Sequence, residues 1–459
     1  MGAHAGGPGL MYGGGSPDVS LTVTSLAESL MPQRRPIVVP RSFVRIAASL
    51  AFAAAFAACS GDPSAPSGAP PRITTLPRAL SGPELAVIGA SNHFSSALLR
   101  AVNSSRALDS NVFISPLSAT MALGMTMNGA AGTTFDEMRA TLGFGTLPRE
   151  EILRSYRDLI ALLRGLDSKV DFRIANAIWT ATRFAAAVEP AFLAESQDYF
   201  GAKVADLDFS SPAALPAING WVKEGTNGKI ERILDALDPN LVMILANAIY
   251  FKGDWRDAFP KGATKDAPFI TARGATVQVP MMTRVGSGRV GGANGRRVVE
   301  AGYGGDAFAM TIILPAESET VDELVTALTP AEWNAQVNSL RESEVDLSLP
   351  KFTLEWEDQL NDELEAMGMP TAFIPGGADF TRLSPSRGRD LYIDFVKQKT
   401  FVAVDEIGTE AAAVTVVGIR ETSAPQRETI RVDRPFVFAI RERLSGTILF
   451  VGKIVDPTR

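Results

Sequence analysis

A short segment close to the C-terminus, residues 405–418, reads DEIGTEAAAVTVVG and combines two local signals that rarely share one segment. Gly408, followed by Thr409 and Glu410, is typical of a hinge that leads into a capped helix, and the three alanines after them are strong helix formers. The run Val414–Val417 is β-branched throughout, which favours a strand. We infer that this segment must tolerate two environments, one outside a β-sheet and one inside it.

Read as a strand, this segment alternates between two faces. One face is uncharged and suits burial; it carries Thr409, Ala411, Ala413, Thr415, Val417 and Ile419. The other face keeps its charges at the two ends; it carries Glu410, Ala412, Val414, Val416, Gly418 and Arg420. Small residues near the hinge would let such a strand enter between two neighbouring strands with little steric obstruction.

The composition is that of an ordinary globular protein. The 459 residues are 46% hydrophobic and 21% charged, and the net charge is −7. The length alone predicts about two or three domains, a prior that recognition of a large single-domain fold would override. No long basic run is present, and we interpret the pair Arg296–Arg297 as part of a solvated loop. We therefore expect no nucleic-acid partner.

An apolar segment near the N-terminus predicts export. Arg41 and Arg45 precede residues 46–58, which read IAASLAFAAAFAA. This run is shorter than the roughly 20 apolar residues that a membrane-spanning helix needs, and it has the length typical of a signal peptide. The alternative is an alanine-rich core helix, but the basic residues before the run and the prolines after it favour export. We assign residues 1–58 to an N-terminal extension and signal peptide, with Met31 as an alternative initiator.

The only cysteine of the chain directly follows this apolar segment. Residues 56–59, FAAC, resemble a bacterial lipobox, in which the cysteine is lipidated and becomes the first mature residue, although Leu usually stands where this chain has Phe56. Residues 60–78 are rich in Pro, Ser, Gly and Ala, which is typical of a flexible tether. We therefore expect lipidation at Cys59, a tether over residues 59–82 and an exported product, extracellular or a lipoprotein of the cell envelope.

The folded domain is expected over residues 83–459, with mixed secondary structure. Apolar residues at helical spacing predict an opening helix that begins near Pro83. The pattern predicts further helices over 113–127 and 134–142, strands over 241–251, 310–314 and 345–349, and a hairpin of strands over 436–440 and 447–455. Helices and strands alternate irregularly, which indicates the α+β class and not a doubly wound sheet.

The sequence offers little support for catalysis. Of its two histidines, His4 lies in the segment expected to be removed and His93 falls on the surface of the opening helix. Motifs of hydrolases and zinc sites are absent from the sequence. Residues 286–291, GSGRVG, match a dinucleotide-binding pattern, but the glycine-rich residues 292–295 cannot form the required helix cheaply, so we expect a mobile loop. We expect no enzyme, cofactor or metal site.

The hinge segment carries a family resemblance. Glu406–Thr415, EIGTEAAAVT, resembles the hinge of inhibitory serpins, a family of serine-protease inhibitors. Similar matches follow in collinear order between residues 83 and 457: NVFISPLSATMALGMTMNGAAGTT (Asn111–Thr134), NAIYFKGDW (Asn247–Trp255), LPKF (Leu349–Phe352) and RPFVFAIRERLSGTILFVGKIVDP (Arg434–Pro457). The resemblance implies a fold of three β-sheets and about nine helices with an exposed reactive-centre loop. It also implies a monomer that acts as a suicide substrate, whose cleaved loop inserts into the main sheet.

The resemblance assigns roles to individual residues. The hinge comprises Glu406, Gly408, Thr409, Glu410, Ala411, Ala412 and Ala413. The shutter, a polar cluster beneath the opening strands, comprises Ser115, Ser118, Asn247 and Gln398, the last standing where the family usually has a histidine. Trp255 matches the tryptophan of the breach, where insertion begins.

The resemblance also places the reactive bond. At the family's usual distance from the hinge glutamate, the cut falls between Thr422 and Ser423, and the small Thr422 points to elastase-like or subtilisin-like serine proteases as partners. Arg420–Glu421 is the competing bond, suited to trypsin-like enzymes. The alternative function is that of a non-inhibitory serpin acting as a binding or chaperone-like module. Such members often carry bulky or charged residues where this chain has alanines.

Substituting the expected lipidation site tests the anchor. Cys59→Ser should release the exported protein into the soluble fraction, because the acyl chains that hold it at the membrane could no longer be attached. Cell fractionation with immunodetection measures the distribution, and Ser60→Ala is the matched control. An unaltered protein that is already soluble after export would contradict the anchor and leave export itself intact.

Overall fold

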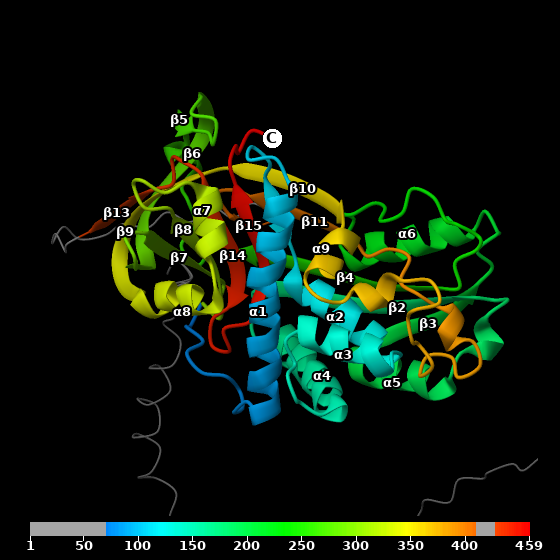
Figure 1. Ribbon diagram of the computed structural model, residues 1–459. Helices are drawn as coiled ribbons and strands as arrows, with labels where there is room; N and C mark the ends of the chain where they lie inside the picture. The colour runs from blue at the N-terminus through cyan, green and yellow to red at the C-terminus, as the bar shows by residue number, and fades with distance from the viewer. Residues whose placement is uncertain (1–69, 410–426) are drawn as a thin grey trace, which may run out of the picture. The chain divides into compact units, whose positions relative to one another are not determined.

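The computed structural model describes residues 70–409 and 427–459, so the apolar segment 46–58, Cys59 and the loop residues 410–426 lie outside the described residues. These ranges form an α+β fold, as expected (Figure 1). The helices are α1 (Gly82–Ser105), α2 (Pro116–Asn128), α3 (Gly132–Thr141), α4 (Arg149–Gly165), α5 (Pro190–Phe200), α6 (Ala214–Gly225), α7 (Val321–Ala327), α8 (Pro330–Ser339) and α9 (Asn361–Ala366). Within the described ranges no helix is both long enough and apolar enough to cross a membrane.

A six-stranded sheet contains the hinge. Its order is β10 (Phe352–Gln359), β11 (Lys397–Val404), β12 (Gly408–Thr409), β4 (Met243–Asp254), β2 (Val170–Ala181) and β3 (Ala202–Leu207). The two-residue strand β12 is antiparallel to both of its neighbours. The beginning of the segment that the sequence predicts to need two environments is thus already inside a sheet.

The second sheet has nine strands. Its order is β1 (Val112–Ile114), β15 (Ile448–Ile454), β14 (Phe436–Glu442), β8 (Phe308–Leu314), β7 (Arg297–Tyr303), β6 (Thr276–Gly291), β9 (Arg341–Pro350) and β13 (Glu428–Arg431), with β5 (Lys265–Ile270) paired to β6. The expectation of three sheets is not met, because the described residues form two. The reason is the length of β6, whose 16 residues pair with β5, β7 and β9 and join all these strands into one sheet.

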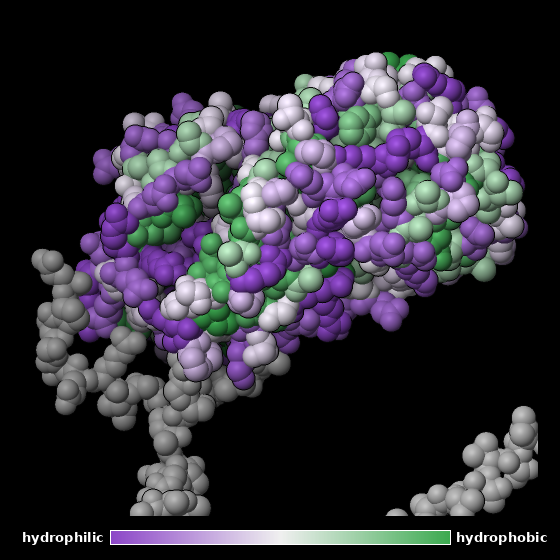
Figure 2. Space-filling view, turned by 90° about the horizontal axis from the view of Figure 1, so that it is seen from below, coloured by the Kyte–Doolittle hydropathy of each residue, from purple (hydrophilic) through white to green (hydrophobic). Residues whose placement is uncertain are grey.

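Helix α1 lies upright in the middle of the domain, in front of the β14–β15 hairpin (Figure 1). Its start is fixed by a capping box: Ser81 Oγ accepts from Glu84 N, and the Glu84 carboxylate accepts from Ser81 N. One face of the helix is fully buried in the core through Phe94 and Leu98. His93 is exposed on the opposite side, as predicted. Viewed from below, hydrophobic residues lie in small groups among hydrophilic ones (Figure 2).

Most of the predicted elements are confirmed, but the first interior helix is shorter than predicted. The helix expected over 113–127 begins at Pro116, and Val112–Ile114 is strand β1, paired with β15. A proline is favourable at the first position of a helix and unfavourable inside one, so Pro116 sets the boundary. The strands around 241–251, 310–314 and 345–349 and the C-terminal hairpin are confirmed, each with slightly different bounds.

Two loop predictions are wrong, the mobile loop at residues 286–291 and the solvated loop position of Arg296. Residues 286–291 belong to strand β6; residues 286–290 pair with β9, where a side chain on Gly288 would crowd Val345, and Gly291 pairs with β7. The glycines therefore permit close packing inside a sheet. Arg296 is 8% exposed and forms ion pairs with Glu319 and Glu332, so it is not a solvated loop residue.

Candidate functional site

Strand β12 enters the six-stranded sheet between β4 and β11. Thr409 lies opposite Gly253 of β4 and Val404 of β11, and Gly408 lies opposite Asp254. A side chain on Gly408 would overlap Gly253 O, so only glycine fits this close approach of two backbones. The Thr409 side chain is 2% exposed. The hinge therefore begins as a strand of which two residues, Gly408 and Thr409, are described.

Beyond β12, no strand of the described residues lies between β4 and β11. Among the described residues, β4 pairs only with β2 and β12, and β11 only with β10 and β12. A cavity of about 100 Å³ lies beside the two edges, lined by residues 244–249 of β4, residues 395–399 at the start of β11, and parts of helices α2 and α6. A second hollow of about 260 Å³, lined partly by residues 241–245 and 390–395, continues from it. We call this space between β4 and β11 the slot.

The structure brings three of the four predicted shutter residues together beside the slot. Gln398 Oε1 accepts from Ser115 N at 3.0 Å, and Gln398 Nε2 donates to Ser115 O at 2.8 Å. Ser115 Oγ donates to Leu449 O and accepts from Ser118 N, which caps helix α2. Gln398 thus fixes the start of α2 through two hydrogen bonds between its side chain and the backbone of Ser115.

The fourth predicted shutter residue, Asn247, has a different partner. It lines the same cavity as Ser118 and Gln398, but its Nδ2 donates to Asn176 Oδ1 at 2.7 Å. Asn176 lies directly opposite on β2 and was missed by the sequence analysis, although a polar residue within an apolar strand is a usable signal. Asn247 Oδ1 is buried and receives no hydrogen bond from any described residue. A buried acceptor in this state costs about 1–3 kcal/mol.

Trp255, the predicted breach residue, forms part of an aromatic cluster next to β12. It is 4% exposed and stacks on Tyr303 with ring centroids 4.5 Å apart. Its indole Nε1 donates to Asp405 O at 2.8 Å, and its backbone N donates to Ile407 O. Tyr303 Oη lies 2.6 Å from Thr409 Oγ1, and burial raises the pKa of this phenol, so it stays protonated. Nothing local in the sequence marks Tyr303 as a partner of the hinge.

Comparison with known proteins identifies the family. A family model described as "Serpin (serine protease inhibitor)" matches residues 89–457. The chain belongs to the serpin family. It is 34% identical to chicken (Gallus gallus) neuroserpin over 365 residues, 76% of this chain and 87% of that protein. It is 35% identical to the leukocyte elastase inhibitor of Sus scrofa over 384 residues, 80% of this chain and 98% of that protein.

A solved structure shows the same fold. The crystal structure of tengpin, a thermophilic serpin in the native state, matches with a TM-score of 0.73 and 31% identity, covering 85% of this chain and 97% of tengpin. The family model describes serine protease inhibitors, and the elastase inhibitor among the relatives supports serine-protease inhibition as the general activity of the family.

In this serpin, an ion pair holds the base of the hinge. Glu406 is 7% exposed; its carboxylate accepts from Lys351 Nζ at 2.9 Å and from Thr264 Oγ1 at 2.9 Å. Burial opposes ionisation of Glu406, but the Lys351 ammonium and the Thr264 hydroxyl outweigh it and hold the pKa of Glu406 below its usual value. Because Phe259 N also donates to Glu406 O, this residue is fixed through both its side chain and its backbone.

The depressed pKa of Glu406 predicts a loss of stability in acid. Its contribution is fully present above the unfolded-state pKa of about 4.3 and is lost as the pH falls through the lower folded-state value. Glu406→Gln should therefore lower the unfolding temperature at pH 7, and the difference from the unaltered protein should shrink below pH 4. Calorimetry across this range measures it, with the exposed Glu317→Gln as control. A difference that is constant with pH would contradict the ion pair's role.

Proposed function

We propose that this serpin inhibits serine endopeptidases as a suicide substrate, through cleavage of the loop within residues 410–426 and insertion of the cleaved strand into the slot. The observation that carries the proposal is that Gly408 and Thr409 occupy the first positions of a strand between β4 and β11. The two strand edges that would receive its continuation face each other across a cavity. Extension of β12 would complete the sheet.

The register at Thr409 predicts the partners of each inserted residue. Continued one residue at a time, it sets Ala411 between Phe251 and Val402, and Ala413 between Ile249 and Thr400. Phe251 and Val402 lie on the core side of the sheet. Phe251 packs against Tyr303 and Phe308, and Val402 is 1% exposed. Alanine side chains fit a crowded core face without displacing these neighbours. The uncharged face predicted from the sequence is thus the face that would be buried.

The same register sets Thr415 between Asn247 and Gln398. A threonine hydroxyl can donate to Asn247 Oδ1, the buried acceptor that lacks a partner in the described structure. Insertion would then remove a penalty of about 1–3 kcal/mol in addition to forming the strand ladder. For a strand of about ten residues at about 1 kcal/mol net per bond, the ladder contributes on the order of 10 kcal/mol. This free energy is available to displace the attached protease.

The proposed chemistry uses the protease's own mechanism. The catalytic serine of the protease attacks the carbonyl carbon of Thr422, the peptide bond breaks, and the new amino group of Ser423 leaves with the C-terminal part of the chain. The acyl-enzyme ester remains between Thr422 and the protease. Insertion carries the protease along the sheet and distorts its active site before water can hydrolyse the ester. A small residue before the cut favours elastase-like or subtilisin-like proteases, and Arg420–Glu421 remains the bond that a trypsin-like enzyme would cut.

We also propose that the protein acts as a monomer outside the cytoplasm, held by a lipid on Cys59. The support is the apolar segment 46–58 and the lipobox-like residues that end at the cysteine.

Substitution of Thr409 separates insertion from cleavage. Thr409→Arg should convert the inhibitor into a substrate, because the guanidinium would have to enter the buried site beside Tyr303, and burial of an unpaired charge costs several kcal/mol. We expect the yield of covalent complex to fall by about tenfold or more, for which 1.4 kcal/mol suffices. Denaturing gel electrophoresis with an elastase-like protease measures complex and cleaved product. Thr409→Ser, which keeps the hydroxyl, is the control, and an undiminished complex with the arginine variant would refute the mechanism.

The reactive bond can be located directly. The peptide released from the protease complex should begin at Ser423, because cleavage after Thr422 gives the inserted strand its usual length. Mass spectrometry of the released peptide identifies its first residue. A peptide that begins at Glu421 would instead establish Arg420 as the residue before the cut and point to trypsin-like targets.

A further inference from the structure

The residues just before helix α1 lie against the turn that joins β7 to β8. Ile73 N donates to Gly305 O at 2.7 Å, and its side chain packs against the same glycine. Arg256 Nη1 donates to Pro70 O at 2.7 Å and lies 3.4 Å from Gly304 O, so it ties the segment to the turn. The sequence predicted a free tether up to residue 82, but residues 70–73 are held at the domain surface.

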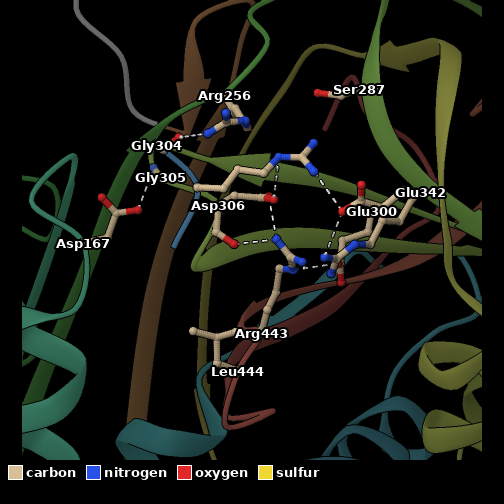
Figure 3. Close-up of polar contacts among 12 residues, drawn as sticks. Asp167, Arg256, Ser287, Glu300, Gly304, Gly305, Asp306, Glu342, Arg443 and Leu444 are labelled. Atoms are coloured by element: carbon tan, nitrogen blue, oxygen red, sulfur yellow. Dashed lines mark hydrogen bonds and ion pairs between the residues drawn. The ribbon is translucent and has the colours of Figure 1, made fainter. Parts of the chain in front are cut away.

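Arg72 adds two ion pairs to this contact. Its Nη1 lies 2.8 Å from Glu342 Oε1 of β9, and its Nε lies 3.6 Å from Asp306 Oδ2 in the turn. Asp306 has a left-handed backbone conformation and is also paired with Arg443 at 2.6 Å. Figure 3 shows Asp306, Arg443, Glu300 and Glu342 in one cluster, next to Arg256 and Gly304.

The other side of the same turn holds the hinge. Tyr303, the last residue of β7, stacks on Trp255 and reaches Thr409 Oγ1 through its hydroxyl. Gly304 N of the turn donates to Asp254 O at the end of β4 at 2.9 Å, and Arg256 N, just after β4, donates to Gly302 O of β7 at 2.8 Å. The end of β7 and the turn that follows it therefore contact the N-terminal segment, the end of β4 and the hinge.

We infer that residues 70–73 form a brace that fixes the β7–β8 turn, and that Arg72 is a positioning residue which acts through Tyr303 to hold Thr409 between β4 and β11 before cleavage. The consequence of this brace for inhibition rests on the proposed function. Insertion that starts from a strand end already in the sheet is faster, so a loosened brace gives water more time to hydrolyse the acyl-enzyme.

The chain contains a matched control in the same segment. Arg78 pairs with Glu84 at 2.5 Å and supports the capping box of α1. Within the described part of the chain, its hydrogen bonds go to Ala79, Glu84 and Asp158 and not to the β7–β8 turn. A segment that only covers the core would make Arg72→Ala and Arg78→Ala alike in their effects. If residues 70–73 form a brace, Arg72→Ala should affect the hinge and Arg78→Ala should not.

Hydrogen exchange of the uncleaved protein tests the inference without any protease. Arg72→Ala should speed amide exchange in the peptide that contains Gly408 and Thr409 by about three- to fivefold, as expected for loss of a partly buried ion pair. Arg78→Ala should leave that peptide unchanged. Equal exchange in both variants, or no change with Arg72→Ala, would overturn the brace.

A double-mutant cycle tests the route through Tyr303. Tyr303→Phe removes the hydroxyl that meets Thr409 and keeps the ring stacked on Trp255. In this background, Arg72→Ala should have little further effect on exchange at the hinge, because both substitutions disrupt one path. An undiminished effect would refute Tyr303 as the link.

The stoichiometry of inhibition connects the brace to function. With an elastase-like protease, Arg72→Ala should require more inhibitor molecules per protease inactivated than either the unaltered protein or Arg78→Ala. An unchanged stoichiometry would overturn the functional part of the inference. If the unaltered protein forms no covalent complex with any serine protease tested, the proposed function fails, whereas the exchange results still decide whether the brace exists.

Discussion

The hydrogen-bonding capacity of two strand edges governs this structure. Strands β4 and β11 face each other as the neighbours of a strand of which two residues, Gly408 and Thr409, are described. Backbone N–H and C=O groups are obligatory hydrogen-bonding groups, so edges of this kind favour whatever strand can reach them. The hinge is covalently attached at one end of the slot and needs no diffusion to reach it. In the proposed mechanism, the remaining features control when the strand enters and how far.

Those features lie at separate places along the slot. At its start, Glu406 is held by Lys351, and Thr409 is held by Tyr303. Farther along, Gln398 and Ser115 fix the start of α2, while Asn247 Oδ1 accepts no hydrogen bond from residues 70–409 or 427–459. The first group keeps the strand end in register. Under the proposed mechanism, the second group offers a contact that only a deeply inserted strand reaches, so full insertion would be favoured over partial insertion.

The sequence predicts the features that depend on local residue patterns. The alternation predicts a buried face that begins with Thr409, and Thr409 is buried, while the other residues of that face lie outside the described residues. The resemblance groups Ser115, Ser118 and Gln398, and hydrogen bonds connect these three residues. Contacts between segments far apart in the chain were missed, because nothing near Tyr303, Asn176 or Arg72 in the sequence specifies their partners. The single nine-stranded sheet was missed for the same reason, since pairing of one long strand with three others is a property of the tertiary structure.

Gln398 affects the pH range over which the start of helix α2 keeps its hydrogen bonds. It offers Ser115 one donor and one acceptor at once, through Nε2 and Oε1. A histidine, which serpins usually carry here, can do the same only while its ring is neutral, because an imidazolium has two donors and no acceptor. An amide does not titrate between pH 5 and 8. The hydrogen bonds between Gln398 and the Ser115 backbone therefore persist in mildly acidic surroundings, where a histidine at this position would lose its acceptor.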